Sequence, residues 1–202
     1  TVVVNTAPNA GTNSSVVRCS NDPSFNLFVQ LGGTPDGGGA WSGPGGVHSG
    51  TFLPGTDQPG TYTYTVQGTA PCANASAVVN VSVVQAPAAG TNGSTAVCSN
   101  DASFQLVNEL GGSPDPNGTW TGPGGANNGT FVPGTSPEGV YTYTVPGTSP
   151  CANDLATVTV TVVPAPNAGT NGSVTVCSDQ PSVGLFGLLG GTPDNNGTWT
   201  RP

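Results

Sequence analysis

A 79-residue repeat constrains the fold of this chain more than any other feature of its sequence. Residues 8–86 align with 87–165 without a gap, and 48 of the 79 aligned positions are identical. Two sets of residues recur at the same interval, the cysteines Cys19, Cys98 and Cys177 and the tryptophans Trp41, Trp120 and Trp199. A unit of this length is a small domain in a tandem array and is longer than a solenoid repeat. We therefore expect each unit to fold by itself.

The repeat divides the chain into four segments. Residues 1–6 are expected to be the last strand of a preceding unit, 7–85 and 86–164 two complete units, and 165–202 a truncated third. Neither end of the chain coincides with a unit boundary, so we expect a window of a longer array. The linker between units is about a dozen residues long and contains proline, which restricts bending between neighbours.

Composition excludes several classes of partner. The 32 glycines and 20 prolines oppose helix formation. Two arginines and no lysine against ten acids give a net charge of −8, which leaves no basic surface for nucleic acid or anionic lipid. No apolar stretch approaches the roughly 20 residues that span a bilayer. We predict neither nucleic-acid binding nor membrane insertion.

Alternating apolar residues predict strands. Residues 61–66 read TYTYTV, which places Tyr62, Tyr64 and Val66 on one face, and Val79, Val81 and Val83 repeat the pattern. We expect these two runs to form an antiparallel hairpin at the end of the unit. Shorter strands are predicted around residues 16–17, 24–31, 40–42 and 51–53. Six or seven short strands separated by Gly/Pro turns predict an all-β, immunoglobulin-like antiparallel sandwich.

The cysteines predict a disulfide within each unit. We expect Cys19–Cys72 and Cys98–Cys151, and a partner for Cys177 beyond residue 202. Each bridge would pin the first strand to the loop between the last two strands and stabilise its unit by about 4 kcal/mol. Such bonds persist in oxidising surroundings. The alternatives are two free thiols per unit or a zinc site, and a single histidine disfavours zinc.

The sequence predicts no catalytic site and no cofactor. His48 is the only histidine and aligns with Asn127, so a nucleophile–histidine pair has no repeated basis, and we interpret His48 as a solvated loop residue. Asp36, Asp115 and Asp194 recur in the context GG-x-P-D, where a turn role is favoured and calcium binding is the weaker alternative. For the three tryptophans, core packing is favoured over glycan contact.

Several motifs point to a known family. The runs C-S-N-D-x-S-F-x-L, L-G-G-x-P-D-x-x-G-x-W-x-G-P-G-G, G-x-Y-T-Y-T-V and P-C-A-N occur in both complete units. Together they resemble the tandem immunoglobulin-like repeats of very large secreted surface adhesins and fibre proteins of Bacteroidota. The resemblance implies a non-catalytic extracellular protein of the cell surface or of a biofilm filament. Its partners would be neighbouring repeats and other copies in a filament.

Two classes of function remain at the level of sequence. The first is a structural segment of a long extracellular filament or adhesin stalk, in which each unit would add about 30 to 45 Å. The second is a carbohydrate-binding array that uses the tryptophans and the Gly/Pro loops to contact glycans.

Overall fold

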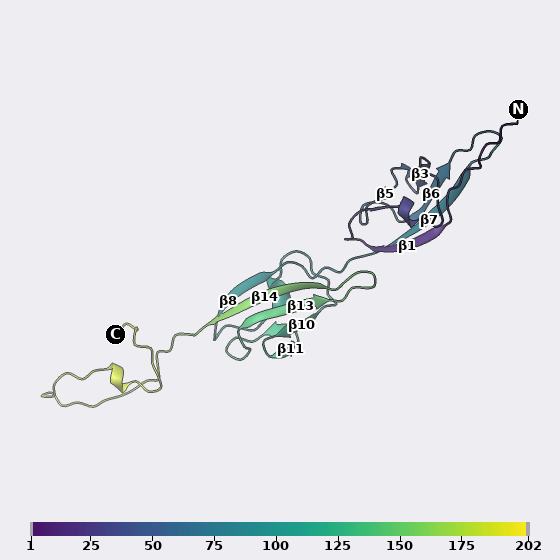
Figure 1. Cartoon of the computed structure of the whole chain (residues 1–202). Coiled ribbons are helices and arrows are strands. Elements are labelled where there is room, and N and C mark those ends of the chain that lie inside the picture. Colours follow the sequence, from purple (N-terminus) through teal and green to yellow (C-terminus); the bar gives the residue numbers. More distant parts are fainter. Residues whose placement is uncertain (1, 201–202) are drawn as a thin grey trace.

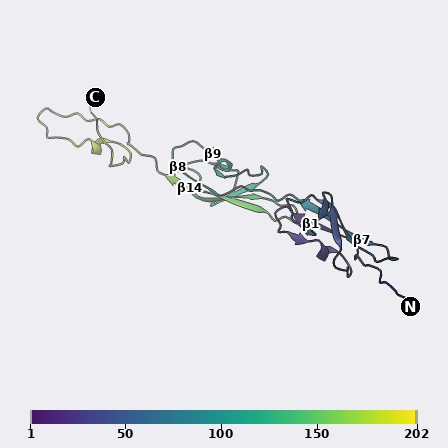
Figure 2. The same ribbon diagram turned by 90° about the horizontal axis from the view of Figure 1, so that it is seen from above.

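The computed structural model describes residues 2–200. Thr1, Arg201 and Pro202, which belong to the first and last predicted segments, lie outside the described residues. Two folded units and a third segment follow one another along an extended line, with the two chain ends at opposite ends of the molecule (Figures 1 and 2). Each complete unit has its own hydrophobic core.

Each unit contains seven strands and one short 3-10 helix. The first unit comprises β1 (Ser14–Cys19), β2 (Phe25–Asn26), η1 (Phe28–Gln30), β3 (Ala40–Gly43), β4 (Gly46–His48), β5 (Thr51–Phe52), β6 (Gly60–Val66) and β7 (Ala75–Val84). The second comprises β8 (Gly93–Cys98), β9 (Phe104–Gln105), η2 (Leu106–Glu109), β10 (Thr119–Gly122), β11 (Gly125–Asn127), β12 (Thr130–Phe131), β13 (Gly139–Val145) and β14 (Asp154–Val163). The strand number agrees with the prediction.

The strands of each unit form a five-stranded and a two-stranded sheet. The order is β1-β7-β6-β3-β4 with β2-β5 in the first unit, and β8-β14-β13-β10-β11 with β9-β12 in the second. This arrangement confirms the immunoglobulin-like sandwich. One pairing differs from the purely antiparallel prediction, because β1 runs parallel to β7 and β8 parallel to β14.

The predicted hairpin is present and supplies most of the core. β6 pairs antiparallel with β7, and Tyr62 lies opposite Val79. Tyr62, Tyr64 and Val66 are buried on one face of β6, as the alternation predicts. Residues 24–31, predicted as one strand, instead form β2 and η1, because the Asn26 side chain accepts a hydrogen bond from the Phe28 amide and turns the chain.

Two glycines explain the motif G-x-W-x-G. A Cβ atom on Gly43 would overlap the ring of Tyr62, and one on Gly39 would overlap the ring of Tyr64. Each tyrosine ring therefore occupies the space that a side chain at its glycine would need. Trp41 lies between these glycines with its ring 5.1 Å from that of Tyr64.

The third segment retains several hydrogen bonds of the complete units. Thr170 and Gly190 exchange two backbone hydrogen bonds, as Thr12 and Gly32 do in the first unit. No strand occurs among the described residues of this segment, 165–200; its one regular element is η3 (Phe186–Leu188). Most of its large apolar side chains are exposed, and Trp199 is 58% exposed, whereas Leu188 and Leu189 are half-buried. In the second unit the equivalent side chains are covered by β13 and β14, which come later in the repeat.

Val158→Ala should lower the free energy of unfolding of the second unit by about 2 kcal/mol, because the side chain is fully buried and its loss leaves a cavity. Val163→Ala is the matched control on the same strand: Val163 is 56% exposed, and its loss should cost less than about 0.5 kcal/mol. Hydrogen exchange in urea, resolved by unit, measures both. Equal costs would contradict the assignment of the core face.

Candidate functional site

A disulfide between the two units is the most distinctive chemical feature of the structure. Cys19 of the first unit is bonded to Cys151 of the second, with the two Cα atoms 5.0 Å apart and a sequence separation of 132. The predicted pairs Cys19–Cys72 and Cys98–Cys151 are therefore wrong. Within the described residues, Cys72, Cys98 and Cys177 have no disulfide partner.

The length of the last strand explains why the pairs within a unit do not form. Cys19 pairs with Val84 at the end of β7, whereas Cys72 precedes Ala75 at its beginning. Ten residues at about 3.3 Å each separate the two ends of β7 by about 30 Å. A disulfide requires Cα atoms within about 7 Å. The two cysteines of one unit therefore lie at opposite ends of that unit.

The disulfide closes over the linker. At the end of the first unit, the Ser20 amide donates to the Val84 carbonyl at 2.8 Å, and the Ser20 hydroxyl accepts from the Ala86 amide at 2.9 Å. The loop between β13 and β14 reaches back from the second unit, so that Cys151 Sγ lies 3.5 Å from the Val84 carbonyl oxygen. We call the Cys19–Cys151 bond with this loop and linker the clasp.

The clasp borders a shallow groove of about 390 Å³. The linker forms one wall through Gln85, Ala86 and Pro87, and the loop of the second unit forms another through Pro146 and Thr148. Asp115, Pro116 and Asn117 of the second unit complete the lining, and the Asp115 carboxylate accepts a hydrogen bond from the Ala88 amide at 2.9 Å. Loop and linker residues therefore form most of the walls of the groove.

The recurring aspartates hold the start of each unit. Asp36 accepts a hydrogen bond from the Asn9 amide at 2.8 Å through its carboxylate and donates its own amide to the Asn9 carbonyl at 2.7 Å. Asp115 and Asp194 make the same pair of bonds with Ala88 and Asn167. All three carboxylates thus accept a hydrogen bond from a backbone amide at the start of their unit. Among residues 2–200, no three acidic, histidine or cysteine side chains gather at one point.

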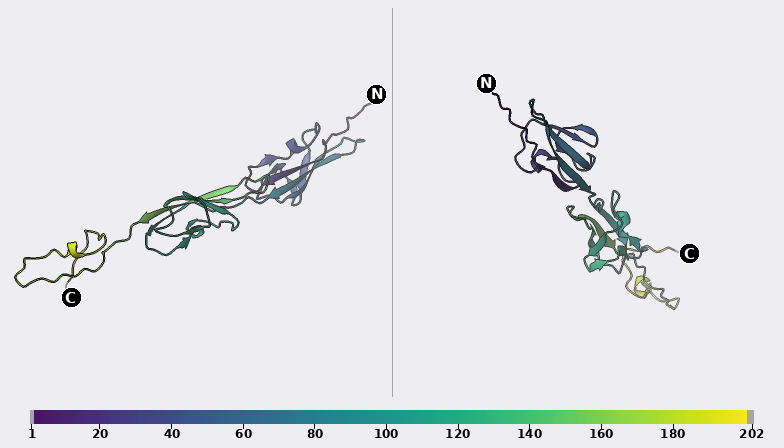
Figure 3. Two further views of the ribbon diagram at one scale, coloured as in Figure 1. Left: turned by 90° about the horizontal axis from the view of Figure 1, so that it is seen from below. Right: turned by 90° about the vertical axis from the view of Figure 1, so that its right-hand side faces the viewer.

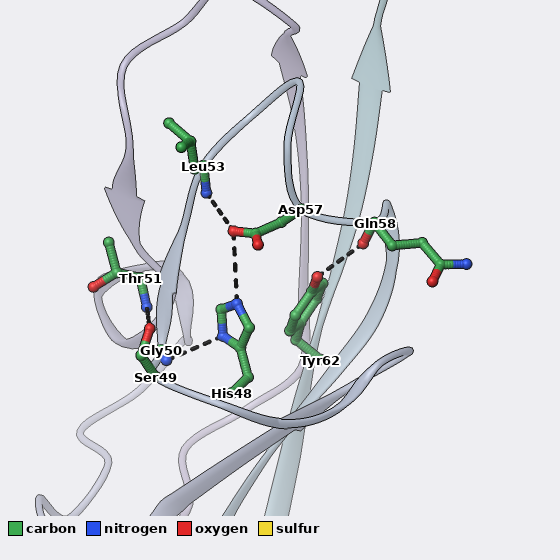
Figure 4. Close-up of polar contacts among 8 residues, drawn as sticks. All are labelled: His48, Ser49, Gly50, Thr51, Leu53, Asp57, Gln58 and Tyr62. Carbon is green, nitrogen blue, oxygen red and sulfur yellow. Dashed lines mark hydrogen bonds and ion pairs between the residues drawn. The ribbon is translucent and has the colours of Figure 1, made fainter.

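His48 lies in a polar cluster between β4 and β5 (Figure 4). Its Nδ1 accepts a hydrogen bond from the Gly50 amide at 3.0 Å, and its Nε2 lies 3.7 Å from Asp57 Oδ2. The same Asp57 oxygen accepts from the Leu53 amide at 2.6 Å. The His48 side chain is only 16% exposed, so the expectation of a solvated loop histidine is wrong.

In the second unit, different side chains accept the hydrogen bonds of the equivalent turn amides. Asn127 Oδ1 accepts from the Gly129 amide at 2.7 Å, and Ser136 Oγ accepts from the Val132 amide at 3.0 Å. Asn127 aligns with His48 and Ser136 with Asp57. Both pairs satisfy turn amides. His48 and Asp57 therefore satisfy amides of the turn, and the neighbouring Ser49 hydroxyl does the same by accepting a hydrogen bond from the Thr51 amide at 3.2 Å (Figure 4).

Two buried tyrosines complete these turns. Burial raises the pKa of Tyr62 above its ordinary value, and the nearby Asp57 carboxylate adds to the effect; burial likewise raises the pKa of Tyr141. Both hydroxyls therefore stay protonated and donate, Tyr62 to the Gln58 carbonyl at 2.8 Å and Tyr141 to the Pro137 carbonyl at 2.7 Å.

The tryptophans of the complete units belong to the core. Trp41 and Trp120 are each 8% exposed, and their rings pack against Tyr64 and Tyr143. Each tryptophan also lines a surface hollow beside the same tyrosine, of about 300 Å³ at Trp41 and about 340 Å³ at Trp120. With 8% of each residue exposed, neither ring is a broad platform on which a sugar could stack. Trp199 is exposed in the third segment, where the covering strands of the repeat are absent from residues 165–200.

Comparison with known proteins supports the fold. No family model matches the chain, and no curated protein matches its sequence. Among solved structures, the insect immune protein hemolin superposes with a TM-score of 0.51 at 15% identity, over 81% of this chain and 48% of hemolin. The three-domain titin fragment I67–I69 gives a TM-score of 0.42 at 11% identity, over 76% and 64% of the two chains.

The N-terminal four immunoglobulin domains of Dscam1 give a TM-score of 0.41 at 16% identity, over 80% of this chain and 47% of that one. This chain thus spans about half the length of hemolin and of the Dscam1 fragment. The likeness to hemolin shows tandem immunoglobulin-like domains. Separately, none of the helical segments within residues 2–200 is long and apolar enough to cross a bilayer.

Non-reducing peptide mapping should recover Cys19 linked to Cys151, with Cys72, Cys98 and Cys177 labelled by iodoacetamide. Cys19 and Cys72 should not be linked, because they lie at opposite ends of β7 and are too far apart to form a disulfide. Full reduction before labelling is the control and should label all five cysteines. A peptide that links Cys19 to Cys72 would contradict the clasp.

His48→Ala should lower the free energy of unfolding of the first unit by about 1 to 2 kcal/mol, because the Gly50 amide loses its acceptor. His48→Asn should cost much less, because Asn127 makes the equivalent bond in the second unit. Urea denaturation of both variants measures the difference. Equal losses for the two would show that the imidazole itself is needed.

Proposed function

We propose that the two units form a non-catalytic structural segment of an extracellular filament or adhesin stalk, in which disulfides transmit tension from one unit to the next. The observation that carries the proposal is the Cys19–Cys151 bond. A bond within a unit stabilises that unit alone. A bond between units limits how far they can separate and turn, which is useful to a protein under load.

The geometry supports a load-bearing role. The units follow one another in an extended line in three further views (Figures 2 and 3). Cys19 lies near the beginning of the first unit's sequence and Cys151 near the end of the second's, so the disulfide closes a loop that contains most of both units. Tension applied at the chain ends passes through this bond. The residues inside the loop are then shielded from extension.

The surroundings implied by this chemistry are extracellular. Disulfides persist in secreted and surface proteins and are rare in reducing compartments. The resemblance to the surface proteins of Bacteroidota supports a bacterial cell surface or biofilm filament, with neighbouring repeats and other copies as partners. The carbohydrate-binding alternative has less support, because Trp41 and Trp120 are buried.

Single-molecule stretching of the whole chain, held by its ends, tests the proposal. When an oxidised chain is fully stretched, the residues between Cys19 and Cys151 should not contribute to its contour length. Reduction should increase that contour length by about 450 Å, because the two cysteines are 132 residues apart and each residue spans about 3.4 Å. Cys177→Ser is the control and should leave this difference unchanged. The same contour length in both redox states would overturn the proposal.

A further inference from the structure

Two cysteines without a partner occupy the same settings as the two bonded ones. Cys72 aligns with Cys151, and Cys98 aligns with Cys19, each one repeat apart. Both are half-buried thiols in the described chain. Their settings can be compared atom by atom with those of the bonded pair.

The loop that carries Cys72 matches the loop of the clasp. The Cys72 amide donates to the Thr69 carbonyl at 2.9 Å, as the Cys151 amide does to Thr148. Cys72 Sγ lies 3.6 Å from the Asn5 carbonyl oxygen, and Cys151 Sγ lies 3.5 Å from that of Val84. Asn5 and Val84 are equivalent positions of the repeat. The loop is therefore already closed over the chain segment that enters the first unit.

The strand end that carries Cys98 matches the other half of the clasp. The Ser99 amide donates to the Val163 carbonyl at 2.8 Å, and the Ser99 hydroxyl accepts from the Ala165 amide at 2.9 Å. These bonds repeat those of Ser20 with Val84 and Ala86 at the same lengths. The Cys98 amide also donates to Asp101, as that of Cys19 does to Asp22. Both halves of the clasp are thus preformed.

We infer that Cys72 and Cys98 are the open halves of two further clasps, whose partner in each case is another copy of this repeat. Cys72 takes the first cysteine of a preceding unit, and Cys98 takes the second cysteine of a following unit. The two cannot bond to each other within one chain. The β6–β7 loop, which carries Cys72, lies near the N-terminal end of the molecule, whereas β8, which ends at Cys98, runs to the far end of the second unit (Figure 1). This inference rests on the proposed function and names the partner that it requires.

The chemistry is oxidation of two thiols to one disulfide. The thiolate of one cysteine attacks a small disulfide such as oxidised glutathione and forms a mixed disulfide, releasing one glutathione thiolate. The second cysteine then attacks the protein sulfur of that mixed disulfide and releases the other. Two protons and two electrons leave the cysteines, and one oxidised glutathione becomes two reduced molecules.

Successive clasps would overlap along the array. The loop closed by Cys19 and Cys151 already contains Cys98, and the clasp formed by Cys98 closes beyond Cys151. Each residue between the first and last clasps then lies inside at least one disulfide-closed loop. Stretching could not unravel any unit in that range without breaking a covalent bond.

The test lengthens the chain by one unit. Residues 86–164 are duplicated in tandem within the full chain, which is oxidised with a glutathione redox buffer and labelled with iodoacetamide. The addition brings two cysteines, yet we expect the number of labelled thiols to stay at three, because Cys98 now bonds to the second cysteine of the inserted unit. Five labelled thiols, with Cys98 among them, would overturn the inference.

Two variants of the lengthened chain serve as controls. Cys98→Ser should expose the second cysteine of the inserted unit to labelling, whereas Cys177→Ser should leave every other pairing unchanged. Unaltered tryptophan fluorescence reports that both fold. If Cys98→Ser leaves the inserted cysteine protected, its partner is another residue and the inference fails.

The unmodified chain shows whether a separate copy can supply the partner. Oxidised at high concentration, it would form head-to-tail multimers through Cys98 of one copy and Cys72 of the next, which collapse to one band on reduction. A chain that stays monomeric here but pairs Cys98 in the lengthened form assigns the partner to the same chain. Recovery of Cys19–Cys151 with Cys98 labelled in both forms would refute this inference alone and leave the proposed function intact.

Discussion

The ten-residue strand that ends each unit is the element on which the rest of the structure depends. β7 pairs with β6 on one side and with β1 on the other, so it joins the core hairpin to the first strand. Its inward side chains include Val79 and Val81, which are buried. Its length also sets the distance between the two cysteines of a unit. One strand thus determines both the packing within a unit and the position of the bonds between units.

Different kinds of side chain stabilise the interior of each unit, its turns and the connection between the two units. Aromatic side chains such as Tyr64 and Trp41 are used within the core, where burial and stacking stabilise each unit. Polar side chains such as Asp36 and His48 satisfy backbone amides of turns. The Cys19–Cys151 disulfide joins the two units covalently, so their attachment does not depend on ion pairs between their surfaces.

Local patterns predicted much of the fold. The alternation through Tyr62 and Tyr64 identified β6, and its face is buried as expected because the period of a strand is two residues in any context. β4 was missed because Gly46–His48 is short and its Val47 is exposed, so no alternation marks it. The polar roles of His48 and Asp57 were missed because their partners are backbone amides, which leave no signal in a sequence. The exchange of His48 for Asn127 was the one available hint, since both side chains offer an acceptor to a turn.

By itself, the sequence determined the repeat length, the strand faces and the immunoglobulin-like class, because these follow from periodicity and from contacts close along the chain. Only the tertiary structure decided which cysteines meet. Had β1 run antiparallel to β7, Cys19 would lie near the start of β7 and close to Cys72, within reach of a bond inside the unit. The parallel pairing instead places Cys19 beside Val84, at the end that faces the next unit. β1 and β7 are the first and last strands of the unit, so their relative direction depends on the path of all the chain between them. The spacing of residues in the sequence does not show that path.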